Sequence, residues 1–274
     1  TTEIYTLSLH DALPILYVPV AHWVWAPDGW LTQLGALDYA GGTVVHINAG
    51  VAGLVCAMVI GPRAGFGRQA MMPHNLALTL TGAALLWVGW FGFNAGSALA
   101  ADARAGMAML VTQLAAAAAG LAWMCAEWLT RGRPSALGLV SGAVGGLVAV
   151  TPAAGFVAPG SALLIGLVAG VGCYLGATLF KRALGCDDAL DAFGIHGVGG
   201  LLGALLTGWL ASPAIGGVKG YFTVQLTGVA ATAAYSALMT LLVLLAIDRL
   251  VGLRVNESTE ADGLDIVEHG EAVA

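Results

Sequence analysis

The sequence has very little charge for its length. Only 9% of its 274 residues are Asp, Glu, Lys or Arg, whereas a soluble globular protein carries about 25%. Hydrophobic residues make up 58% of the chain, and its mean hydropathy is +0.85. This composition is not that of a soluble protein, and it predicts an all-α polytopic protein in a lipid bilayer. We expect no nucleic-acid partner.

Cysteines are also few, and their spacing excludes most cysteine chemistry. The four of them are far apart and contain no CxxC pair: Cys56, Cys125, Cys173 and Cys186. We interpret them as small buried hydrophobic residues rather than metal ligands or disulfides. No nucleophile–base pair or phosphate-binding loop stands out either. We therefore expect no cofactor and do not favour an enzyme.

Six long windows of the sequence contain no charged residue. A helical span needs roughly 20 apolar residues, and each window is long enough for one, except 134–180, which holds two. The Pro/Gly-rich stretch TPAAGFVAPGS at 151–161 supplies the turn between those two. With a further span that ends near Trp25, the count is about eight transmembrane helices. The windows are 39–62, 69–101, 105–126, 134–180, 192–218 and 220–247.

Basic residues indicate the orientation. Eight of the ten fall in alternate connections or after the last span: Arg63, Arg68, Arg131, Arg133, Lys181, Arg182, Arg249 and Arg254. Only Arg104 and Lys219 lie in the other connections. Because cytoplasmic loops carry the excess of Lys and Arg, the side with eight, including the C-terminal tail, is predicted to face the cytoplasm.

Two segments of the chain have the same spacing between an aspartate and a histidine. In DYAGGTVVHINAGVAG, Asp38 precedes His46 by eight residues, and in DALDAFGIHGVGGLLG, Asp188 precedes His196 by the same distance. The copies lie five spans apart, so they cross the membrane in opposite directions. This pattern is typical of an inverted-topology repeat, whose site lies near the midplane at the repeat interface. Ionisable groups within spans usually mark pathways, although each histidine could instead be a satisfied polar group between helices.

The two aspartates have a stronger structural interpretation. An acid at the start of a helix caps free N–H groups and complements the helix dipole. We therefore favour capping and site-shaping over direct ligand contact for Asp38 and Asp188. Glycines near each histidine favour close packing of helices. They occur at 41, 42, 50, 53, 197, 199, 200 and 203.

Aromatic residues supply a further candidate site. In WVGWFGFNAGSA, Trp90, Phe93 and Ser97 recur at three- and four-residue intervals and share one helix face. Trp25 lies at the same outer level of the predicted bundle. These residues could form an interfacial aromatic belt, or they could hold a small cation by cation–π attraction and a hydrogen bond. For Trp25 and Ser97 the residues alone leave both interpretations open.

These segments together resemble the ammonium transporter (Amt/Mep/Rh) family. The resemblance runs from about Tyr17 to the C-terminus, through AHWVW, DYAGGTVVHINAGVAGL, GWFGFNAGSA, DAFGIHGVGGLLGALLTG and LRVNESTEADGLDIVEHGE. It implies an eleven-span inverted-repeat subunit of a homotrimer in the cytoplasmic (inner) membrane. Each subunit of such a trimer has its own pore, which conducts ammonium by way of deprotonated ammonia.

The resemblance also assigns roles to single residues. His46 and His196 match the twin pore histidines, and Trp25 and Ser97 match the outer recruitment site for ammonium. Asp38 matches the acid that shapes that site, and Asp188 is its structural counterpart in the second repeat. Phe93 matches one of the stacked phenylalanines of the pore gate, and Trp90 matches a pore-lining tryptophan.

The N-terminus departs from the family pattern. The first three spans have no counterpart here, and residues 1–16, TTEIYTLSLHDALPIL, are interpreted as a non-native segment. Residues 17–252 would be the transmembrane domain, with family spans four to eleven. Residues 253–274 would be a cytoplasmic tail, either a disordered solvating segment or, as in the family, a partner of PII-type signal proteins.

Two rival functions remain at this stage. A membrane haem protein of electron transport would use His46 and His196 as axial ligands. An ammonium sensor would bind the same ligand without appreciable flux.

Overall fold

The computed structural model describes residues 13–69, 71 and 73–271, and every regular element in these residues is helical. Short π-helical stretches are labelled η. The elements in order are η1 (Leu13–Tyr17), α2 (Val18–Trp25), α3 (Trp30–Leu34), η2 (Gly42–Ile47), α4 (Asn48–Ile60), α5 (Leu76–Gly96), α6 (Ala103–Arg131), α7 (Ala136–Val150), α8 (Pro159–Leu175), η3 (Gly176–Phe180), α9 (Lys181–Leu184), η4 (Phe193–Gly197), α10 (Val198–Leu210), α11 (Pro213–Gly216), α12 (Phe222–Leu250), α13 (Glu257–Asp262) and η5 (Asp265–His269).

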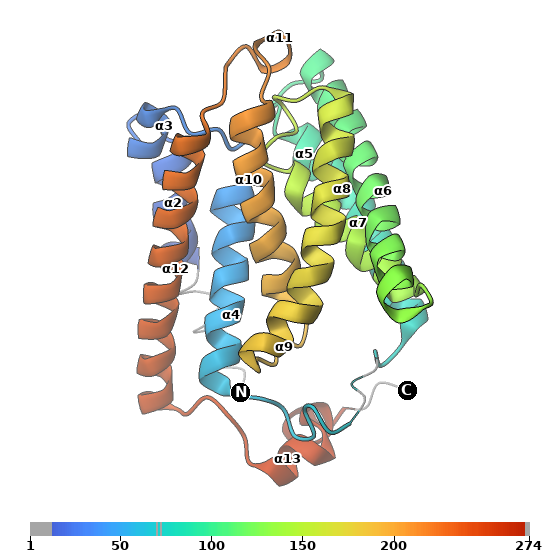
Figure 1. Cartoon of the computed structure of the whole chain (residues 1–274). Coiled ribbons are helices and arrows are strands. Elements are labelled where there is room, and N and C mark those ends of the chain that lie inside the picture. The colour runs from blue at the N-terminus through green and yellow to red at the C-terminus, as the bar shows by residue number, and fades with distance from the viewer. Residues whose placement is uncertain (1–12, 70, 72, 272–274) are drawn as a thin grey trace.

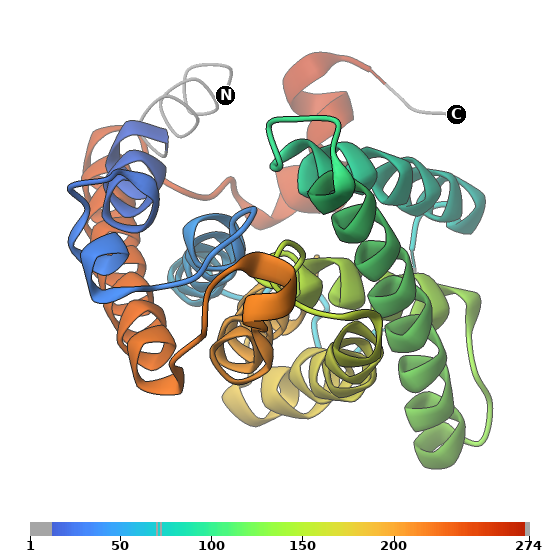
Figure 2. The ribbon, with the colours of Figure 1, turned by 90° about the horizontal axis from the view of Figure 1, so that it is seen from above.

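The helices form an upright bundle (Figure 1). Seen from above, α4 and α10 lie between α12 on one side and α5 and α6 on the other (Figure 2). Among the described residues, six helical segments have the length and apolar composition to cross a membrane: Gly42–Ile60, Leu76–Gly96, Ala103–Arg131, Pro159–Leu184, Phe193–Leu210 and Phe222–Leu250. The chain is therefore a multi-pass membrane protein.

The prediction of about eight spans agrees with the positions of the helices but not with all their lengths. The two remaining segments are shorter. Helix α7 has 15 residues, and η1 with α2 runs only from Leu13 to Trp25. The all-helical fold is confirmed, while the exact number of spans stays a prediction.

Helix boundaries follow from capping residues. The side chains of Asn75, Asp102 and Ser135 precede α5, α6 and α7, and each accepts a hydrogen bond from a backbone N–H of the first turn. At the other end of α6, Gly132 adopts φ 76°, a left-handed conformation that glycine reaches without steric cost. Pro159 opens α8, where its missing N–H costs nothing.

Small residues bring α6, α7 and α8 into backbone contact. A Cβ placed on Gly146 of α7 or on Gly166 of α8 would lie 2.4 Å from the carbonyl oxygen of Ala115 in α6. The same carbonyl ridge of α6 continues to Ala119, which lies against Gly170. In lipid, where tails are as apolar as leucine, such close packing is a main source of helix association.

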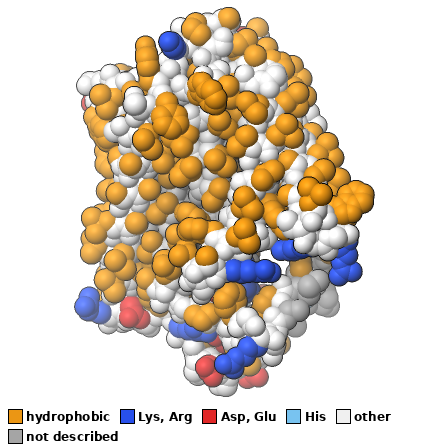
Figure 3. Space-filling view, viewed as in Figure 1, with side chains coloured by type: hydrophobic (Ala, Val, Ile, Leu, Met, Phe, Trp, Pro, Cys, Tyr) orange, Lys and Arg blue, Asp and Glu red, His pale blue; other side chains and the backbone are white. Residues whose placement is uncertain are grey.

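The sides and the ends of the bundle differ in polarity. Hydrophobic side chains cover the visible side of the bundle, whereas most visible Lys and Arg side chains gather at the end where α9 and α13 lie (Figure 3). Helix α5 is the most open of the long helices, because only Trp90 and Asn94 are buried along it. Leu85 and Val88 of the same helix are about two-thirds exposed.

The first part of the N-terminal segment lies outside the described residues. Residues 13–16 are described and contact the bundle. The carbonyl oxygens of Ile15 and Leu16 accept hydrogen bonds from the Tyr235 hydroxyl and the Asn48 side chain, at 2.6 and 2.8 Å. The division into residues 1–16, 17–252 and 253–274 stays a prediction.

Candidate functional site

Asp38 caps the helix that carries His46. Its carboxylate is buried and accepts four backbone N–H groups, those of Gly41 and Gly42 through Oδ1 and those of Thr43 and Val44 through Oδ2, at 2.7–3.1 Å. Such charge-assisted bonds are about twice as strong as neutral ones. This is the geometry of a capping carboxylate, and it fixes the start of η2.

Asp188 has the same place in the second repeat. It is buried, and its carboxylate accepts the N–H groups of Ala192, Phe193 and Gly194 at 2.9, 2.8 and 3.4 Å. These residues open the π-helical stretch η4, which carries His196. Both histidines thus lie on π-helical turns, which occur frequently at functional sites.

The two repeats cross in backbone contact. A Cβ on Gly50 of α4 would lie 2.2 Å from the backbone nitrogen of Gly197. A Cβ on Gly200 of α10 would lie 3.0 Å from the carbonyl oxygen of Gly42. Because only glycine fits at such a crossing, the two π-helical turns approach closely enough for their histidines to meet.

The histidines form a pair at this crossing. His46 Nδ1 lies 3.2 Å from His196 Nδ1, and the ring centroids are 5.3 Å apart. His46 is only 2% exposed, whereas His196 is half-buried. Each neutral imidazole has one donor and one acceptor nitrogen, so a contact between two Nδ1 atoms requires one ring to donate and the other to accept.

Trp90 and Thr151 hold His46 on its other sides. The Trp90 ring stacks on His46, with centroids 5.4 Å apart and an interplanar angle of 19°. His46 Nε2 lies 3.2 Å from the Thr151 hydroxyl, to which Trp90 Nε1 also donates a hydrogen bond of 3.0 Å. Sequence reasoning missed Thr151, because it opens the 151–161 turn and was considered only as part of that turn.

The two residues expected at the outer site, Trp25 and Ser97, have separate hydrogen-bond partners. The indole N–H of Trp25 donates to the Asp38 carbonyl oxygen at 2.8 Å. The Ser97 hydroxyl turns back along its own helix and donates to the Phe93 carbonyl oxygen at 2.8 Å. In the described residues, no hydrogen bond joins Trp25 to Ser97. The ring of Phe93 is 6.0 Å from that of His46.

A cavity of about 690 Å³ connects the histidines to the face of α5. Its wall is almost entirely apolar, with the two imidazoles as its ionisable groups. The lining residues are Val45, His46, Ala49, Gly82, Leu85, Leu86, Gly89, Trp90, Phe93 and His196. Of the residues named from the sequence, this cavity brings together both histidines, Trp90 and Phe93.

This geometry does not fit bis-histidine ligation of haem. Imidazole–metal bonds are about 2.0–2.1 Å long, so two nitrogens on opposite sides of an iron lie about 4 Å apart, with a macrocycle between them. The nearest nitrogens of His46 and His196 are 3.2 Å apart and face each other directly. The haem interpretation is therefore dropped.

Comparison with known proteins identifies the family. A model described as Ammonium Transporter Family matches residues 8–274. The chain belongs to the ammonium transporter family.

Curated ammonium transporters of this family are close in sequence. One is ammonium transporter Amt1 of Archaeoglobus fulgidus, which is 52% identical over 266 residues, 94% of this chain and 67% of the relative. Another is an ammonium transporter of Aquifex aeolicus, 51% identical over 93% of this chain and 61% of the relative. The chain thus spans about two-thirds or less of the length of these relatives.

Solved structures of the family have the same fold. A crystal structure of Candida albicans Mep2 is 36% identical, with a TM-score of 0.86 over 96% of this chain and 62% of that one. A protein described as a sensor Amt protein is 33% identical, with a TM-score of 0.87 over 94% of this chain and 67% of that one. The curated relatives are thus named as transporters, and this last structure is named as a sensor.

At the end of the bundle where α9 and α13 lie (Figure 1), ion pairs and a hydrogen bond connect three segments of this member of the ammonium transporter family. Arg63, after α4, binds Asp187 through Nε and Nη2, both at 2.8 Å. Glu260 of α13 binds Arg254 at 2.7 Å and accepts the N–H of Ala64 at 2.8 Å. The tail is therefore connected to the loop after α4, which is in turn connected to the segment that precedes η4.

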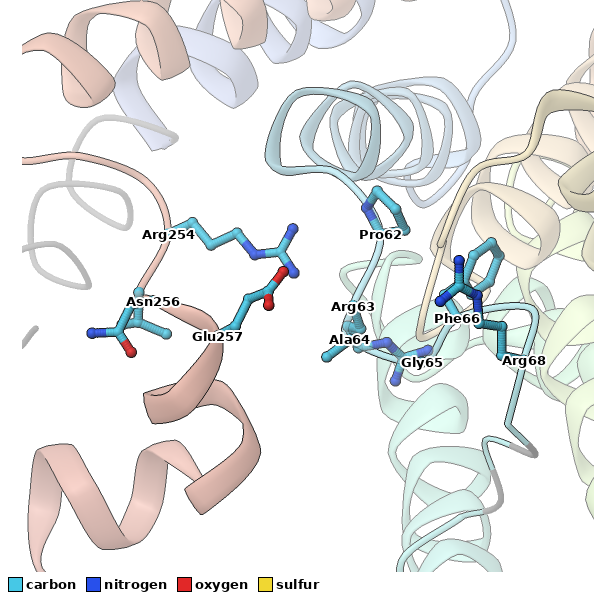
Figure 4. Close-up of a pocket in the computed structure, with 10 residues that line it drawn as sticks. Pro62, Arg63, Ala64, Gly65, Phe66, Arg68, Arg254, Asn256 and Glu257 are labelled. Atoms are coloured by element: carbon cyan, nitrogen blue, oxygen red, sulfur yellow. The ribbon is translucent and has the colours of Figure 1, made fainter.

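A second, open cavity lies beside these contacts, which also shift the pKa values of two acids. The cavity, of about 590 Å³, lies between the loop 62–68 and the tail segment 254–257 (Figure 4). The hydrogen bond from Arg63 lowers the pKa of Asp187, which is 1% exposed. The hydrogen bond from Arg254 likewise lowers the pKa of Glu260.

Proposed function

We propose that this chain forms the greater part of a protein that carries ammonium across a membrane. Membership of the ammonium transporter family supports transport as the activity. The single observation that carries the mechanism is the pair of imidazoles, 3.2 Å apart, in an otherwise apolar cavity. An apolar wall with two neutral imidazoles suits ammonia rather than a bare cation.

Desolvation decides which species passes. Taking an isolated cation into a medium of low dielectric constant costs tens of kcal/mol in the idealised limit. Neutral ammonia needs only its hydrogen bonds replaced, and an imidazole offers both a donor and an acceptor. Potassium has no proton to lose, so a pore that admits only the deprotonated species rejects it. We infer that ammonium loses a proton at the histidine pair, which relays it, so that the apolar cavity conducts ammonia.

The remaining residues have proposed roles along this path. Trp25 and Ser97 gather ammonium at the outer end, where cation–π attraction contributes about 0.5–2 kcal/mol. Asp38 shapes that end through the backbone of η2, and Asp188 does the same for the second repeat. Phe93 closes the outer side of the cavity, and Trp90 lines it against His46.

The assembly and setting are proposed with the activity. We infer a homotrimer in the cytoplasmic (inner) membrane with the C-terminal tail in the cytoplasm, as the eight basic residues on that side favour. The ion-paired tail is then a surface for a PII-type signal protein. Its contact with the loop after α4, through Glu260 and Ala64, supports a role at the inner end of the pore.

The test is charge movement in proteoliposomes after an ammonium jump, with a potassium jump as control. This chain is compared with a chimera that carries the N-terminal part of the Archaeoglobus fulgidus relative. We expect an ammonium current without a potassium current, and its loss when His46→Leu and His196→Leu are combined. An unchanged current in the double variant would rule out the histidine relay.

A second function has one observation in its favour. The solved structure described as a sensor Amt protein shares this fold. Ammonium binding without current, in both this chain and the chimera, would favour a sensor. Binding is measured by isothermal titration of the purified protein with ammonium chloride against sodium chloride.

A further inference from the structure

The Thr151 hydroxyl is the most heavily bonded side-chain group beside the histidine pair. Thr151 is fully buried at the end of α7. Its oxygen lies 2.8 Å from the Leu147 carbonyl oxygen, 3.0 Å from Trp90 Nε1 and 3.2 Å from His46 Nε2. A hydroxyl has one proton to donate and two lone pairs that accept. Three neighbours therefore use its full hydrogen-bonding capacity.

The chemistry of two neighbours determines the role of the third. The Leu147 carbonyl can only accept, so it takes the hydroxyl proton. The indole N–H of Trp90 can only donate, so it fills one lone pair. The second lone pair faces His46 Nε2, and it forms a hydrogen bond only if that nitrogen carries a proton.

The distances favour this arrangement over a rotated hydroxyl. If the hydroxyl proton pointed at His46 Nε2, its bond to Leu147 would be lost. The separation of Thr151 Oγ1 from the Leu147 oxygen, 2.8 Å, is the usual length of an O–H···O bond, whereas 3.2 Å to His46 Nε2 is at the long end for a hydrogen bond.

We propose that Thr151 is a positioning residue that keeps the proton of neutral His46 on Nε2 and leaves His196 Nε2 as the open proton acceptor of the pair. With Nε2 protonated, His46 Nδ1 has a lone pair. His196 Nδ1 then carries the proton in the contact of 3.2 Å. His196 Nε2 is consequently unprotonated, and no hydrogen bond to it occurs within the part of the chain that the structure describes.

This order fixes where a proton enters the pair, at His196 Nε2, and it rests on the proposed function. One N–H bond of ammonium breaks and one forms at His196 Nε2, so ammonia is released and His196 becomes an imidazolium. Its Nδ1 proton can then cross to His46 Nδ1, which makes His46 the imidazolium and leaves His196 neutral. Charge and protons balance at each step, and Thr151 keeps its bond to His46 throughout.

The decisive measurement is the tautomer of each histidine, read by nitrogen-15 NMR on the full chain labelled at histidine nitrogens. Protonated and bare imidazole nitrogens have clearly separated shifts, and the His46→Gln and His196→Gln variants assign the signals. We expect a protonated Nε2 in His46 and a bare Nε2 in His196. A bare Nε2 in His46 of the unmodified chain overturns the proposal.

Two variants separate positioning from a structural role. Thr151→Val removes the hydroxyl and should shift part of the His46 population to the Nδ1-protonated tautomer, whereas Thr151→Ser should restore the original spectrum. Thr207→Val is the matched control, because Thr207 is also fully buried and its hydroxyl donates at 2.7 Å to a carbonyl of its own helix. It should leave both histidines unchanged. An unchanged His46 tautomer in Thr151→Val contradicts the proposal.

The ammonium current provides a second, independent test of the role of Thr151. Loss of the partner that orients a histidine costs about 10–100-fold in metal sites, and we expect Thr151→Val to lower the current at least about 10-fold. Thr151→Ser should restore most of it. Predicted tautomers without any current would refute transport but not the positioning role. Current together with the opposite tautomer would refute the positioning role alone.

Discussion

The two repeats share one spacing of aspartate and histidine, but their histidines have different surroundings. Asp38 and Asp188 cap their helices in the same way, and the two histidines meet at one point. His46 is nevertheless held by Thr151, Trp90 and His196, whereas His196 has a hydrogen bond only to His46 in the described residues. Identical spacing therefore fixes the backbone, while the neighbouring helices decide what each imidazole can do.

The residue before each aspartate shows the same contrast. Leu37 is held by a neutral partner, since its backbone N–H and carbonyl both bond to the buried Gln225 side chain at 2.8 Å. Asp187 is held by an ion pair with Arg63. Leu37 is thus held by neutral hydrogen bonds, whereas Asp187 is held by an ion pair that responds to pH.

The turn that leads into each helix differs as well. Gly41 has φ 120°, a conformation that glycine reaches without cost, and Asp191 is its counterpart with φ 52°. Lys181 stabilises this second turn, because its ammonium group donates to Asp191 Oδ1 at 2.9 Å and to the Asp188 carbonyl at 2.7 Å. A charged contact in the second repeat thus takes the place of glycine in the first.

The largest expected effect comes from the glycines that follow the two histidines at equal offsets, Gly50 with Gly200 and Gly53 with Gly203. Gly50→Ala would place a Cβ 2.2 Å from a backbone nitrogen, and Gly203→Ala would place one 2.1 Å from the Ala149 carbonyl oxygen. We expect each to lower the free energy of unfolding by about 3 kcal/mol. Gly200→Ala and Gly53→Ala, whose nearest atoms lie at 3.0 Å, should cost less.

Thermal unfolding of the four alanine variants in detergent checks this order. The expected loss of stability is larger for Gly50→Ala than for its counterpart Gly200→Ala. It is smaller for Gly53→Ala than for its counterpart Gly203→Ala. Equal losses within each pair would show that the repeats pack symmetrically.

A smaller difference is expected between the two capping acids. Asp38→Ala leaves four buried N–H groups without a partner, and Asp188→Ala leaves three, one of which bonds only at 3.4 Å. Losing a helix cap costs about 0.5–2 kcal/mol, and buried orphan donors add to this. We expect Asp38→Ala to be the more destabilising by about 1 kcal/mol, as measured by thermal unfolding.

The corresponding asparagine variants are the controls. Asn keeps an acceptor oxygen, so part of the lost stability should return in both repeats. A larger loss for Asp188→Ala than for Asp38→Ala would contradict this comparison.

The smallest expected effect is a dependence on pH that arises at Asp187 and has no equivalent at its counterpart Leu37. The hydrogen bond from Arg63 lowers the pKa of Asp187 in the folded protein. A carboxyl with a depressed folded pKa contributes stability that is fully present above its unfolded pKa of about 3.9. This contribution is lost as the pH falls through the lower folded value.

The Asp187→Asn variant isolates this contribution. The unfolding temperature of the unmodified chain should exceed that of the variant near neutral pH, and the gap should narrow below about pH 4. Gln225→Leu, which removes the neutral partner of Leu37, should give a gap that does not change with pH. If the difference in unfolding temperature between Asp187→Asn and the unmodified chain did not change with pH, the ion pair would contribute no pH-dependent stability.

Much of the fold was predictable because it depends on local composition. Neutral windows located the helices, and the shared spacing of Asp38–His46 and Asp188–His196 placed the two histidines at one interface. Helix α7 shows the limit of that approach. The window 134–180 predicted two full spans, yet α7 ends after 15 residues because the TP pair at 151–152 starts a turn.

The contacts of Ser97 and of the tail were less predictable. Helical spacing put Ser97 on one face with Trp90 and Phe93, but it could not show that the Ser97 hydroxyl bonds to the Phe93 carbonyl. The composition of the tail allowed a solvating segment, while Glu260 in fact bonds to Arg254 and to Ala64, which is 196 residues away in the chain.

The sequence by itself determined that this chain lies in a membrane, that it contains a repeat built around two histidines, and which family it joins. The first two follow from composition and spacing, and the third from the resemblance of whole motifs to a known family. Only the tertiary structure decided that Thr151 contacts His46, 105 residues away, and that Asp187 pairs with Arg63. Hydrogen bonds of about 3 Å depend on how separate helices pack, and no local pattern encodes that.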